Sequence, residues 1–274
     1  PPAYAESLER LQNECEPFPY ADAERILQEE LGVRLSKAFR EIRAEPVAAA
    51  SLSQVHYATL RNGREVAIKI QRPGIREQVL GDLDTLGEIA SFLQGHSDAG
   101  RRYEISGLFE EFRKSMLREL DFRQEAMHLV TIGRALSDIP EIIIPQPVMD
   151  FSTSRVLTMD FLDGTKITDI PPVAKTELDG AKLVDALFRA YLKQMLRDGL
   201  FHADPHPGNV LLVGKRIGMI DLGMVAHIGP GLQDRLLQLL IAIGDSRAED
   251  AARSLYLIGE CNDDSDHKGF ERAV

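Results

Sequence analysis

The feature that most constrains this chain is a polar stretch followed by a short apolar segment and a second acidic residue. The stretch reads His-Ala-Asp-Pro-His-Pro-Gly-Asn over residues 202–209, and Asp221 begins an Asp-Leu-Gly triplet further on. This order supplies a carboxylate at Asp204, an amide at Asn209 and a second carboxylate at Asp221. Oxygen ligands suit a hard cation such as magnesium, and one carboxylate can accept a proton. We therefore predict Asp204 as the proton acceptor and Asn209 and Asp221 as magnesium ligands.

The flanking residues predict how this stretch is folded. The apolar segments 210–213 and 217–220 enclose residues 214–216, a pattern that predicts a hairpin returning Asp221 toward Asn209. The proline after Asp204 biases that aspartate away from helical dihedrals. A carboxylate, an amide, a hairpin and a second carboxylate follow one another in this order in kinase-like nucleotide sites. The alternative is that these are ordinary polar loop residues.

A second hairpin is predicted in the first third of the chain. Residues 55–60 and 65–70 are rich in strand formers and enclose an Asn-Gly pair at Asn62, a strong hairpin signal. The second of these strands contains Val-Ala-Ile-Lys, which ends at Lys69. In kinases a lysine in this pattern places a point charge on the nucleotide phosphates. Alone, a lysine on a strand is more often a solvated residue at the edge of a sheet.

Residues 46–54 precede this hairpin, where an orthodox kinase carries a glycine-rich loop. Here the stretch reads Pro-Val-Ala-Ala-Ala-Ser-Leu-Ser-Gln and contains no glycine. Alanine methyl groups crowd a phosphate and resist positive φ values. The stretch could instead begin a short helix, whose N-terminal amides would favour an anion, or be a simple alanine-rich helix start.

Residues 105 to about 135 predict one or two helices. We expect the apolar face of this helical segment to contain Leu108, Phe109, Phe112 and Met116. On a continuous helix Asp121 and Glu125 share a face, whereas Glu119 points elsewhere. We predict that Glu125 forms an ion pair with Lys69, with Glu119 as the second choice. The alternative is a solvated, charged helix face.

Residues 155–164 predict the place where two lobes meet. An apolar strand there runs into a turn that ends at Gly164. A connection of this kind offers main-chain groups to an adenine ring, so we predict contacts at Asp160 and Leu162.

Composition limits the classes of partner and location. The chain has 274 residues, is 44% hydrophobic and 27% charged, and carries a net charge of −11, which argues against non-specific nucleic-acid binding. Its cysteines, Cys15 and Cys261, have no metal-ligand spacing and indicate a reducing compartment. The longest apolar run, near residues 236–243, contains Gln238, and there is no signal peptide. We expect a cytoplasmic fragment of a longer chain, with any membrane association through segments absent from it.

Five stretches together resemble one family. They are the alanine stretch, Val-Ala-Ile-Lys-Ile-Gln-Arg-Pro-Gly over residues 66–74, Glu-Leu-Asp over 119–121, and the two motifs around Asp204 and Asp221. The chain resembles the UbiB/AarF (ADCK) atypical kinases from about Tyr4 to about Leu240. The alanine stretch and the Gln-Arg-Pro-Gly that follows are the specific part, since other kinase-like folds share the remaining motifs.

The resemblance implies a fold, a cofactor and a cellular role. The implied fold class is α+β: a bilobal protein-kinase-like fold with a small N-terminal sheet lobe carrying extra helices and a mainly helical C-terminal lobe. The implied cofactors are ATP or ADP with Mg²⁺. Family members support coenzyme Q or related prenyl-lipid metabolism, so the implied partners are a prenyl lipid or membrane surface and lipid-biosynthesis enzymes.

The resemblance also assigns residues. It places Lys69 on the nucleotide phosphates, makes Asp204 the base-like aspartate, and makes Asn209 and Asp221 metal ligands. The remaining predicted nucleotide-site residues are Ala48, Ala49, Ala50 and Ser51 of the covering loop, Glu119 and Asp121 of the family's Glu-x-Asp element, and Asp160 and Leu162. The family's Lys-x-Gly-Gln element is not in this chain, so we expect the fragment to be less restrained than its parent.

Family members act as ATPases or small-molecule kinases rather than protein kinases. The sequence agrees, because only about ten residues follow Asp221 before a helix near Gly231, and no Ala-Pro-Glu motif is present. We expect an N-terminal helical extension at 1–45, an N-lobe with inserted helices at 46–160 and a C-lobe at 161–274.

Three other functions fit parts of the sequence. A small-molecule phosphotransferase of the aminoglycoside or choline kinase type uses similar motifs. A metal-dependent hydrolase could use His202, Asp204 and His206 as ligands of a transition metal. A non-catalytic scaffold could respond to nucleotide by moving the helix that contains Glu119 and Glu125. In the kinase-like interpretation His202 anchors its loop through a main-chain contact and His206 lines the site.

Overall fold

The structure is a computed structural model that describes residues 15–96, 105–171 and 178–259. The chain forms two compact units: unit 1 comprises Pro1–Val130 and Pro145–Asp163, and unit 2 comprises Thr131–Ile144 and Gly164–Val274. The domain bounds that we expect at residues 45 and 160 stay predictions. Residues Thr131–Ile144 belong to unit 2, although we expect them in the N-lobe. Cys261, both ends of the chain and residues 172–177 lie outside the described residues.

A four-stranded antiparallel sheet forms the centre of unit 1. Its strands, in sheet order, are β1 (Phe39–Ala49), β2 (Ser53–Leu60), β3 (Glu65–Gln71) and β5 (Val156–Asp160). The predicted hairpin joins β2 to β3, and Gly63 takes the positive φ of 87° that its turn requires. The Asn-Gly signal is therefore confirmed.

Alternation along β3 separates a core face from a polar face. Val66, Ile68 and Ile70 are fully buried and pack in one cluster with residues of α2 (Tyr20–Leu31). Successive side chains of a strand point to opposite faces, so Lys69 projects from the other side of the sheet. The short helix α3 (Leu35–Ala38) adds Leu35 to the same core.

A series of hydrogen bonds through buried polar side chains lies beside this core in unit 1. Gln54 is 1% exposed, and its amide accepts from the Phe18 N–H at 3.0 Å. The Gln54 Nε2 lies 2.8 Å from His56 Nε2, and His56 Nδ1 lies 2.9 Å from the Arg43 carbonyl oxygen. An amide nitrogen only donates, so His56 accepts at Nε2 and donates from Nδ1–H. The neutral imidazole therefore satisfies both of its buried ring nitrogens.

The alanine stretch is a strand and not the start of a helix. Ala48 pairs with Val55 and Ala49 with Gln54 in the β1–β2 ladder. The turn that follows, residues 50–52, is closed by the Ala50 N–H, which donates to the Ser53 carbonyl at 2.8 Å. The helical alternative is wrong because the ladder with β2 supplies hydrogen bonds that outweigh the helix propensity of alanine.

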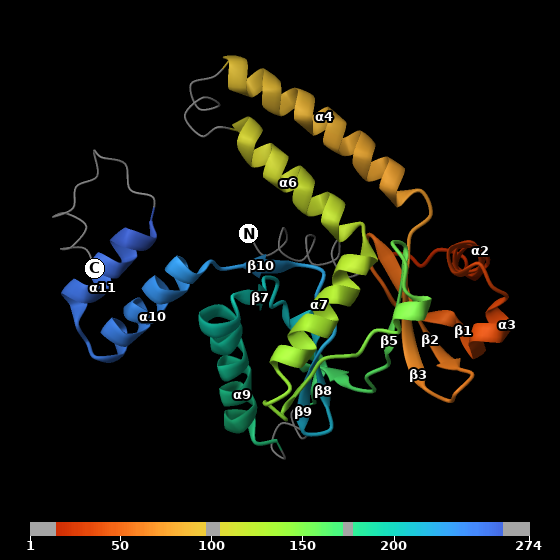
Figure 1. The fold of residues 1–274 in the computed structure, drawn as a ribbon. Helices are drawn as coiled ribbons and strands as arrows, with labels where there is room; N and C mark the ends of the chain where they lie inside the picture. The colour runs from red at the N-terminus through yellow and green to blue at the C-terminus, as the bar shows by residue number, and fades with distance from the viewer. Residues whose placement is uncertain (1–14, 97–104, 172–177, 260–274) are drawn as a thin grey trace. The chain divides into compact units, whose positions relative to one another are not determined.

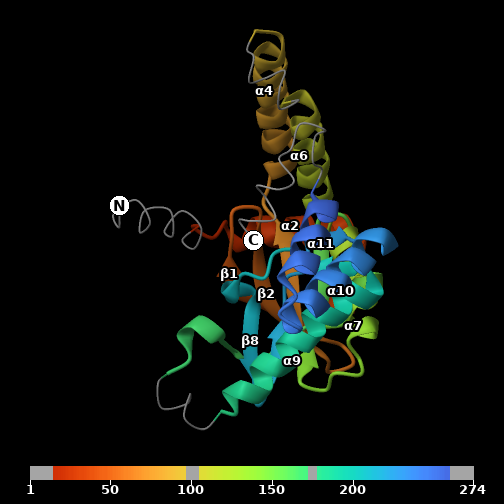
Figure 2. The same ribbon diagram turned by 90° about the vertical axis from the view of Figure 1, so that its left-hand side faces the viewer.

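The predicted helical block contains two helices, α6 (Ile105–Glu119) and α7 (Phe122–Ala135). Helix α4 (Ile75–His96) runs beside α6, and the pair extends away from the sheet (Figures 1 and 2). Leu108 is 64% exposed and Phe112 is 47% exposed, so part of the predicted apolar face is left uncovered. A hydrophobic period identifies apolar stripes but not which of two adjacent stripes is covered.

A second four-stranded sheet lies in unit 2. Its strands, in sheet order, are β4 (Ile142–Ile143), β9 (Arg216–Met219), β8 (Val210–Val213) and β6 (Thr165–Lys166). The predicted hairpin is the β8–β9 pair, in which Val213 is opposite Arg216. The separate strands β7 (Leu200–His202) and β10 (Val225–His227) pair antiparallel. The sheet is tightly packed at Gly164, where a Cβ atom would lie 2.7 Å from the Leu212 carbonyl oxygen.

In the described part of unit 2 after Gly164, three α-helices accompany the strands. They are α9 (Gly180–Lys193), α10 (Pro230–Gly244) and α11 (Ala248–Ile258). Helices α10 and α11 pack through Leu239, Ala242 and Ala251 and lie next to each other in Figure 2. Helix α9 continues into a π-helical turn over Gln194–Asp198. Sheets and helices together give the predicted α+β class, and none of the described helices combines the length and apolar character needed to cross a bilayer.

Candidate functional site

Lys69 and Glu125 form a buried ion pair in unit 1. The Lys69 Nζ donates to Glu125 Oε2 at 2.9 Å and to Oε1 at 3.1 Å. The lysine side chain is 15% exposed and the glutamate side chain 4% exposed. The Lys69 ammonium also lies 5.2 Å from the centre of the Phe122 ring. The predicted ion pair is therefore present, and the first turn of α7 holds the ammonium group at a fixed height above β3.

Asp121 directly precedes α7 and caps its N-terminus, so it does not share a continuous helix with Glu125. Its carboxylate accepts from the Arg123 N–H at 3.1 Å, as an N-cap does, and from the Arg123 guanidinium at 2.7 Å. Hydrogen bonding from Arg123 lowers the pKa of the Asp121 carboxyl below its usual value. The break between α6 and α7 turns the Glu-x-Asp element into a helix junction, with Glu119 as the last residue of α6.

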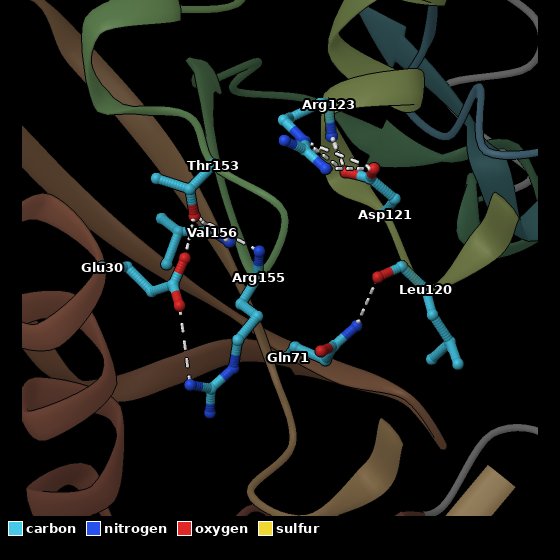
Figure 3. A network of polar contacts seen from close by, with 8 residues as sticks. All are labelled: Glu30, Gln71, Leu120, Asp121, Arg123, Thr153, Arg155 and Val156. Carbon is cyan, nitrogen blue, oxygen red and sulfur yellow. Dashed lines mark hydrogen bonds and ion pairs between the residues drawn. The ribbon is translucent and has the colours of Figure 1, made fainter. Parts of the chain in front are cut away.

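Gln71 connects β3 to this junction, a contact that the sequence analysis did not predict. Its side chain is 1% exposed and donates to the Leu120 carbonyl at 3.1 Å (Figure 3). Lys69 and Gln71 are two residues apart and therefore share a face of β3. One strand thus contacts α7 through a charge and the α6–α7 junction through an amide. The two-residue period of the strand is the sequence signal that places Gln71 on the same face as Lys69.

The start of β5 is fixed by a second group of contacts shown in Figure 3. The Thr153 hydroxyl donates to Glu30 at 2.5 Å and accepts from the N–H groups of Arg155 and Val156 at 3.2 Å each. Glu30 also lies 3.5 Å from the Arg155 guanidinium. Helix α2 therefore holds the N-terminal end of the strand that leads to the predicted adenine contacts.

The other end of β5 is fixed by the Asp160 carboxylate. It accepts from Arg64 Nε at 2.7 Å and from the Gln146 N–H at 3.0 Å. The Asp160 N–H donates in turn to the Gln146 carbonyl at 3.1 Å. The Asp160 side chain thus shapes the chain before Leu162, and adenine contacts at both residues remain predictions.

In unit 2 His202 anchors the strand that leads to Asp204. The His202 N–H donates to the buried Gln194 side chain at 3.0 Å, and its Nδ1 lies 3.3 Å from the Met224 carbonyl oxygen. The Ala203 N–H donates to the same carbonyl at 3.0 Å. His202 is 2% exposed, so it serves as a structural anchor, as the kinase-like interpretation predicts.

The loop from Asp204 to Asn209 is held by its own main chain. The His206 N–H donates to the Asp204 carbonyl at 2.8 Å, and the Asn209 N–H donates to the His206 carbonyl at 2.9 Å. The His206 Nδ1 accepts from the Gly208 N–H at 3.1 Å. The loop therefore folds back on itself through His206, an exposed residue.

Asn209 and Asp221 lie at the same end of the β8–β9 hairpin. The Ile220 N–H donates to the Asn209 carbonyl at 3.1 Å, which extends the ladder one step beyond the Val210–Met219 pair. Asp221 is the next residue, and its carboxylate accepts from the Gly223 N–H at 3.0 Å. The hairpin thus returns the second predicted ligand to the first, as its sequence pattern predicts.

Asp204 lies near Tyr191 of α9. Burial raises the pKa of Tyr191 to about 12, and the Asp204 carboxylate contributes in the same direction. A negative charge disfavours ionisation of a neighbouring phenol. Unit 2 therefore carries Asp204 close to a half-buried hydroxyl that stays protonated.

The donor set of unit 2 fits magnesium better than a transition metal. The amide of Asn209 and the carboxylate of Asp221 are hard oxygen ligands, which magnesium prefers. No group of three His, Cys, Asp or Glu side chains in the described part of the chain is arranged to hold a metal ion. The ring of His202 is buried against the Met224 carbonyl, so the His202–Asp204–His206 metal site of the hydrolase hypothesis is not formed.

Comparisons with known proteins show the family to which the chain belongs. A family model described as the ABC1 atypical kinase-like domain matches residues 10–255. The uncharacterized protein sll1770 of Synechocystis sp. is 35% identical over 100% of this chain and 47% of its own length. The protein ACTIVITY OF BC1 COMPLEX KINASE 8, chloroplastic, of Arabidopsis thaliana is 33% identical over 94% of this chain and 35% of its own length. The chain thus spans less than half of either relative.

The chain is also similar to a solved structure. Rv3197 from Mycobacterium tuberculosis, in complex with erythromycin, is 28% identical, and the two folds superpose with a TM-score of 0.74. The match covers 96% of this chain and 66% of that one. Because the family model matches most of the sequence, the chain belongs to the ABC1 atypical kinase-like family, which confirms the predicted relationship to UbiB/AarF kinases and the predicted protein-kinase-like fold.

Proposed function

We propose that this chain binds ATP or ADP with Mg²⁺ and acts as an ATPase or a small-molecule phosphotransferase. The observation that carries the proposal is the buried ion pair between Lys69 of β3 and Glu125 of α7. An equivalent lysine–glutamate pair must be in place for catalysis in protein kinases. A lysine held in this way is a preorganised point charge for phosphate oxygens.

Each predicted residue has a defined role in this proposal. Lys69 binds the nucleotide phosphates, and Glu125 holds it in position. Asn209 and Asp221 hold magnesium, which when bound neutralises charge on the phosphate oxygens. Asp204 orients the attacking hydroxyl or water and accepts its proton. Asp204 is well suited to this role because the main chain of its loop is fixed on both sides.

The proposed acceptor is water or a small molecule instead of a protein. Only residues 222–229 separate Asp221 from the start of α10, and part of this segment is taken up by β10. Protein kinases dock peptide substrates on a much longer segment at this position. Membership of the family supports a role in coenzyme Q or related prenyl-lipid metabolism, at a membrane surface or with lipid-biosynthesis enzymes.

The test is Mg-ATP turnover by the chain and by Asp204→Asn. We expect turnover to fall by about 100-fold or more, because positioned acid–base groups contribute factors of that order. Binding of Mg-ATP should persist, since Asp204 is not a proposed ligand. Asp234→Asn, on the exposed surface of α10, is the matched control and should behave as the parent. Unchanged turnover in Asp204→Asn would remove the assigned role.

The lipid part of the proposal has a separate test. Mg-ATP turnover is measured with and without a prenylated phenol in detergent micelles. Stimulation by the prenylated phenol, but not by the same micelles containing phenol, is expected. Equal rates in both mixtures would contradict the prenyl-lipid assignment while leaving nucleotide binding intact.

A further inference from the structure

Arg72 contacts both sides of the turn between β1 and β2. It directly follows β3, and its N–H donates to the Leu52 carbonyl at 2.9 Å. Its Nε donates to the Ala50 carbonyl at 3.0 Å. Ser51 lies between these two carbonyls. One residue therefore fixes the peptide groups that flank the tip of the turn, which is the predicted nucleotide-covering turn.

Arg72 also joins this turn to the segment that precedes α2. Its Nη2 donates to the Glu16 carbonyl at 2.7 Å, and its guanidinium carbon lies 5.8 Å from the centre of the Phe18 ring. Both acceptors of the guanidinium are main-chain carbonyls. Hydrogen bonds from a charged donor are stronger than those between neutral groups. The guanidinium is thus used to hold backbone.

The position of Arg72 determines where the tip of the turn points. Arg72 lies two residues after Ile70, whose side chain is in the core with α2, and its guanidinium is near Phe18, which packs against that same core. Arg72 therefore holds the turn from the core face of the sheet, whereas Lys69 projects from the opposite face. In a trans peptide the N–H points away from the C=O of the same unit. The Ser51 N–H, which shares a peptide with the Ala50 carbonyl, consequently points away from Arg72.

A glycine-free turn needs such an external restraint. A glycine-rich loop uses positive φ values to aim its amides at a phosphate. Within the described residues, the non-glycine residue with positive φ is Ser246, far from this turn. The turn of residues 50–52 therefore keeps ordinary dihedrals, and the hydrogen bonds from Arg72 set the direction of its peptide groups.

We propose that Arg72 is a positioning residue for the nucleotide-covering turn. By holding the Ala50 and Leu52 carbonyls, it directs the Ser51 N–H toward a phosphate of the nucleotide. This inference rests on the proposed function, and it adds a role for the Gln-Arg-Pro-Gly stretch and for Ser51. It also makes phosphate affinity depend on the segment around Glu16, because the same guanidinium holds both.

The test compares a ligand that has phosphates with one that lacks them. Dissociation constants for Mg-ADP and for adenosine are measured by calorimetry, with competition for the weaker ligand, on the parent, Arg72→Gln and Arg72→Lys. Arg72→Gln should weaken Mg-ADP about tenfold, the effect of losing one well-placed hydrogen bond to a charged group. Adenosine affinity should not change. The Mg-ADP affinity of Arg72→Lys should lie between those of the parent and Arg72→Gln, because lysine keeps the positive charge but lacks the several N–H donors of the guanidinium.

Two further variants make the result specific. Arg61→Gln is the matched control, since Arg61 Nε donates to the Ser36 carbonyl at 2.7 Å at the other end of β2. It should bind both ligands as the parent does. Ser51→Pro removes the N–H and should reproduce the selective loss for Mg-ADP, which keeps the test decisive if Arg72→Gln fails to fold.

The outcomes distinguish failure of the role proposed for Arg72 from failure of the proposed nucleotide-binding function. Equal weakening of Mg-ADP and adenosine, or unchanged Mg-ADP affinity in Arg72→Gln and Ser51→Pro, overturns the role of Arg72 while nucleotide binding stands. A parent protein that binds neither ligand overturns the proposed function, and this inference with it.

Discussion

Removing the charge of Glu125 should lower the free energy of unfolding by more than the loss of an exposed ion pair would. The Glu125 side chain is 4% exposed and the Lys69 side chain 15%, so water solvates the ammonium poorly once the Glu125 carboxylate is removed. Breaking a buried pair from one side typically costs about 3 kcal/mol, whereas exposed pairs contribute little. We therefore expect Glu125→Gln to lower the free energy of unfolding by about 3 kcal/mol.

A double-mutant cycle isolates the pair from other effects of the two substitutions. Free energies of unfolding of the parent, Lys69→Met, Glu125→Gln and the double variant are measured in urea, with the signal followed by circular dichroism. The double variant should be more stable than the sum of the single losses predicts, by about 2 kcal/mol. Glu111→Gln, which breaks an exposed pair with Lys114, should leave the unfolding midpoint unchanged. Additive losses would refute the claim that Lys69 and Glu125 stabilise each other.

Three further predictions concern stability. Burial lowers the pKa of His56 below its usual value of 6.5, so between the folded-state and unfolded-state pKa values the unfolded chain binds more protons than the folded chain. The free energy of unfolding should therefore fall as the pH drops below 6.5. Urea titrations of His56→Gln should show a weaker fall. Gly164→Ala should cost about 2 kcal/mol in thermal or urea unfolding, since its Cβ would lie 2.7 Å from the Leu212 carbonyl oxygen; parental stability would contradict this. In α4, Gly81→Ala has open space and should stabilise by about 0.8 kcal/mol, whereas Gly87→Ala meets a Phe109 ring carbon at 3.0 Å and should gain less; equal gains in calorimetry would refute the close packing.

Local sequence signals were sufficient for both hairpins. The Asn-Gly pair at Asn62 and the segment between Val213 and Arg216 each specify a turn through residues adjacent in sequence. Alternation then fixed which face of β3 carries Lys69. The position of Asp221 beside Asn209 followed from the same reasoning, since a hairpin must bring its two ends together.

Features that depend on partners distant in sequence are less predictable from local patterns. The stretch from Ala48 to Ala50 has high helix propensity, but the ladder with β2 makes Ala48 and Ala49 the end of a strand, and Ala50 begins the turn. Leu108, Phe109 and Phe112 all fit the helical period, but only the Phe109 ring of these three is shown against α4, at Gly87, whereas Leu108 and Phe112 are exposed. Which stripe a helix buries depends on its partner, and the spacing of apolar residues does not identify that partner.

The positioning residues were the hardest to foresee. Gln71 and Arg72 stood out only as part of a family pattern, because their acceptors are main-chain carbonyls, which leave no trace in a sequence. The cap formed by Asp121 was hidden for a similar reason. An N-cap aspartate and a mid-helix aspartate differ only in where the helix starts, and helix starts are weakly encoded.

Magnesium-dependent nucleotide binding tests the central claim most directly. Calorimetry with ATP and ADP, with and without Mg²⁺, is applied to the chain, to Lys69→Ala and to Asp221→Asn, with Lys215→Ala in the exposed β8–β9 turn as the control. The account predicts binding that requires Mg²⁺, is lost in Lys69→Ala and Asp221→Asn, and persists in Lys215→Ala. A chain that binds neither nucleotide, or Lys69→Ala and Asp221→Asn variants that bind as the parent does, would contradict it.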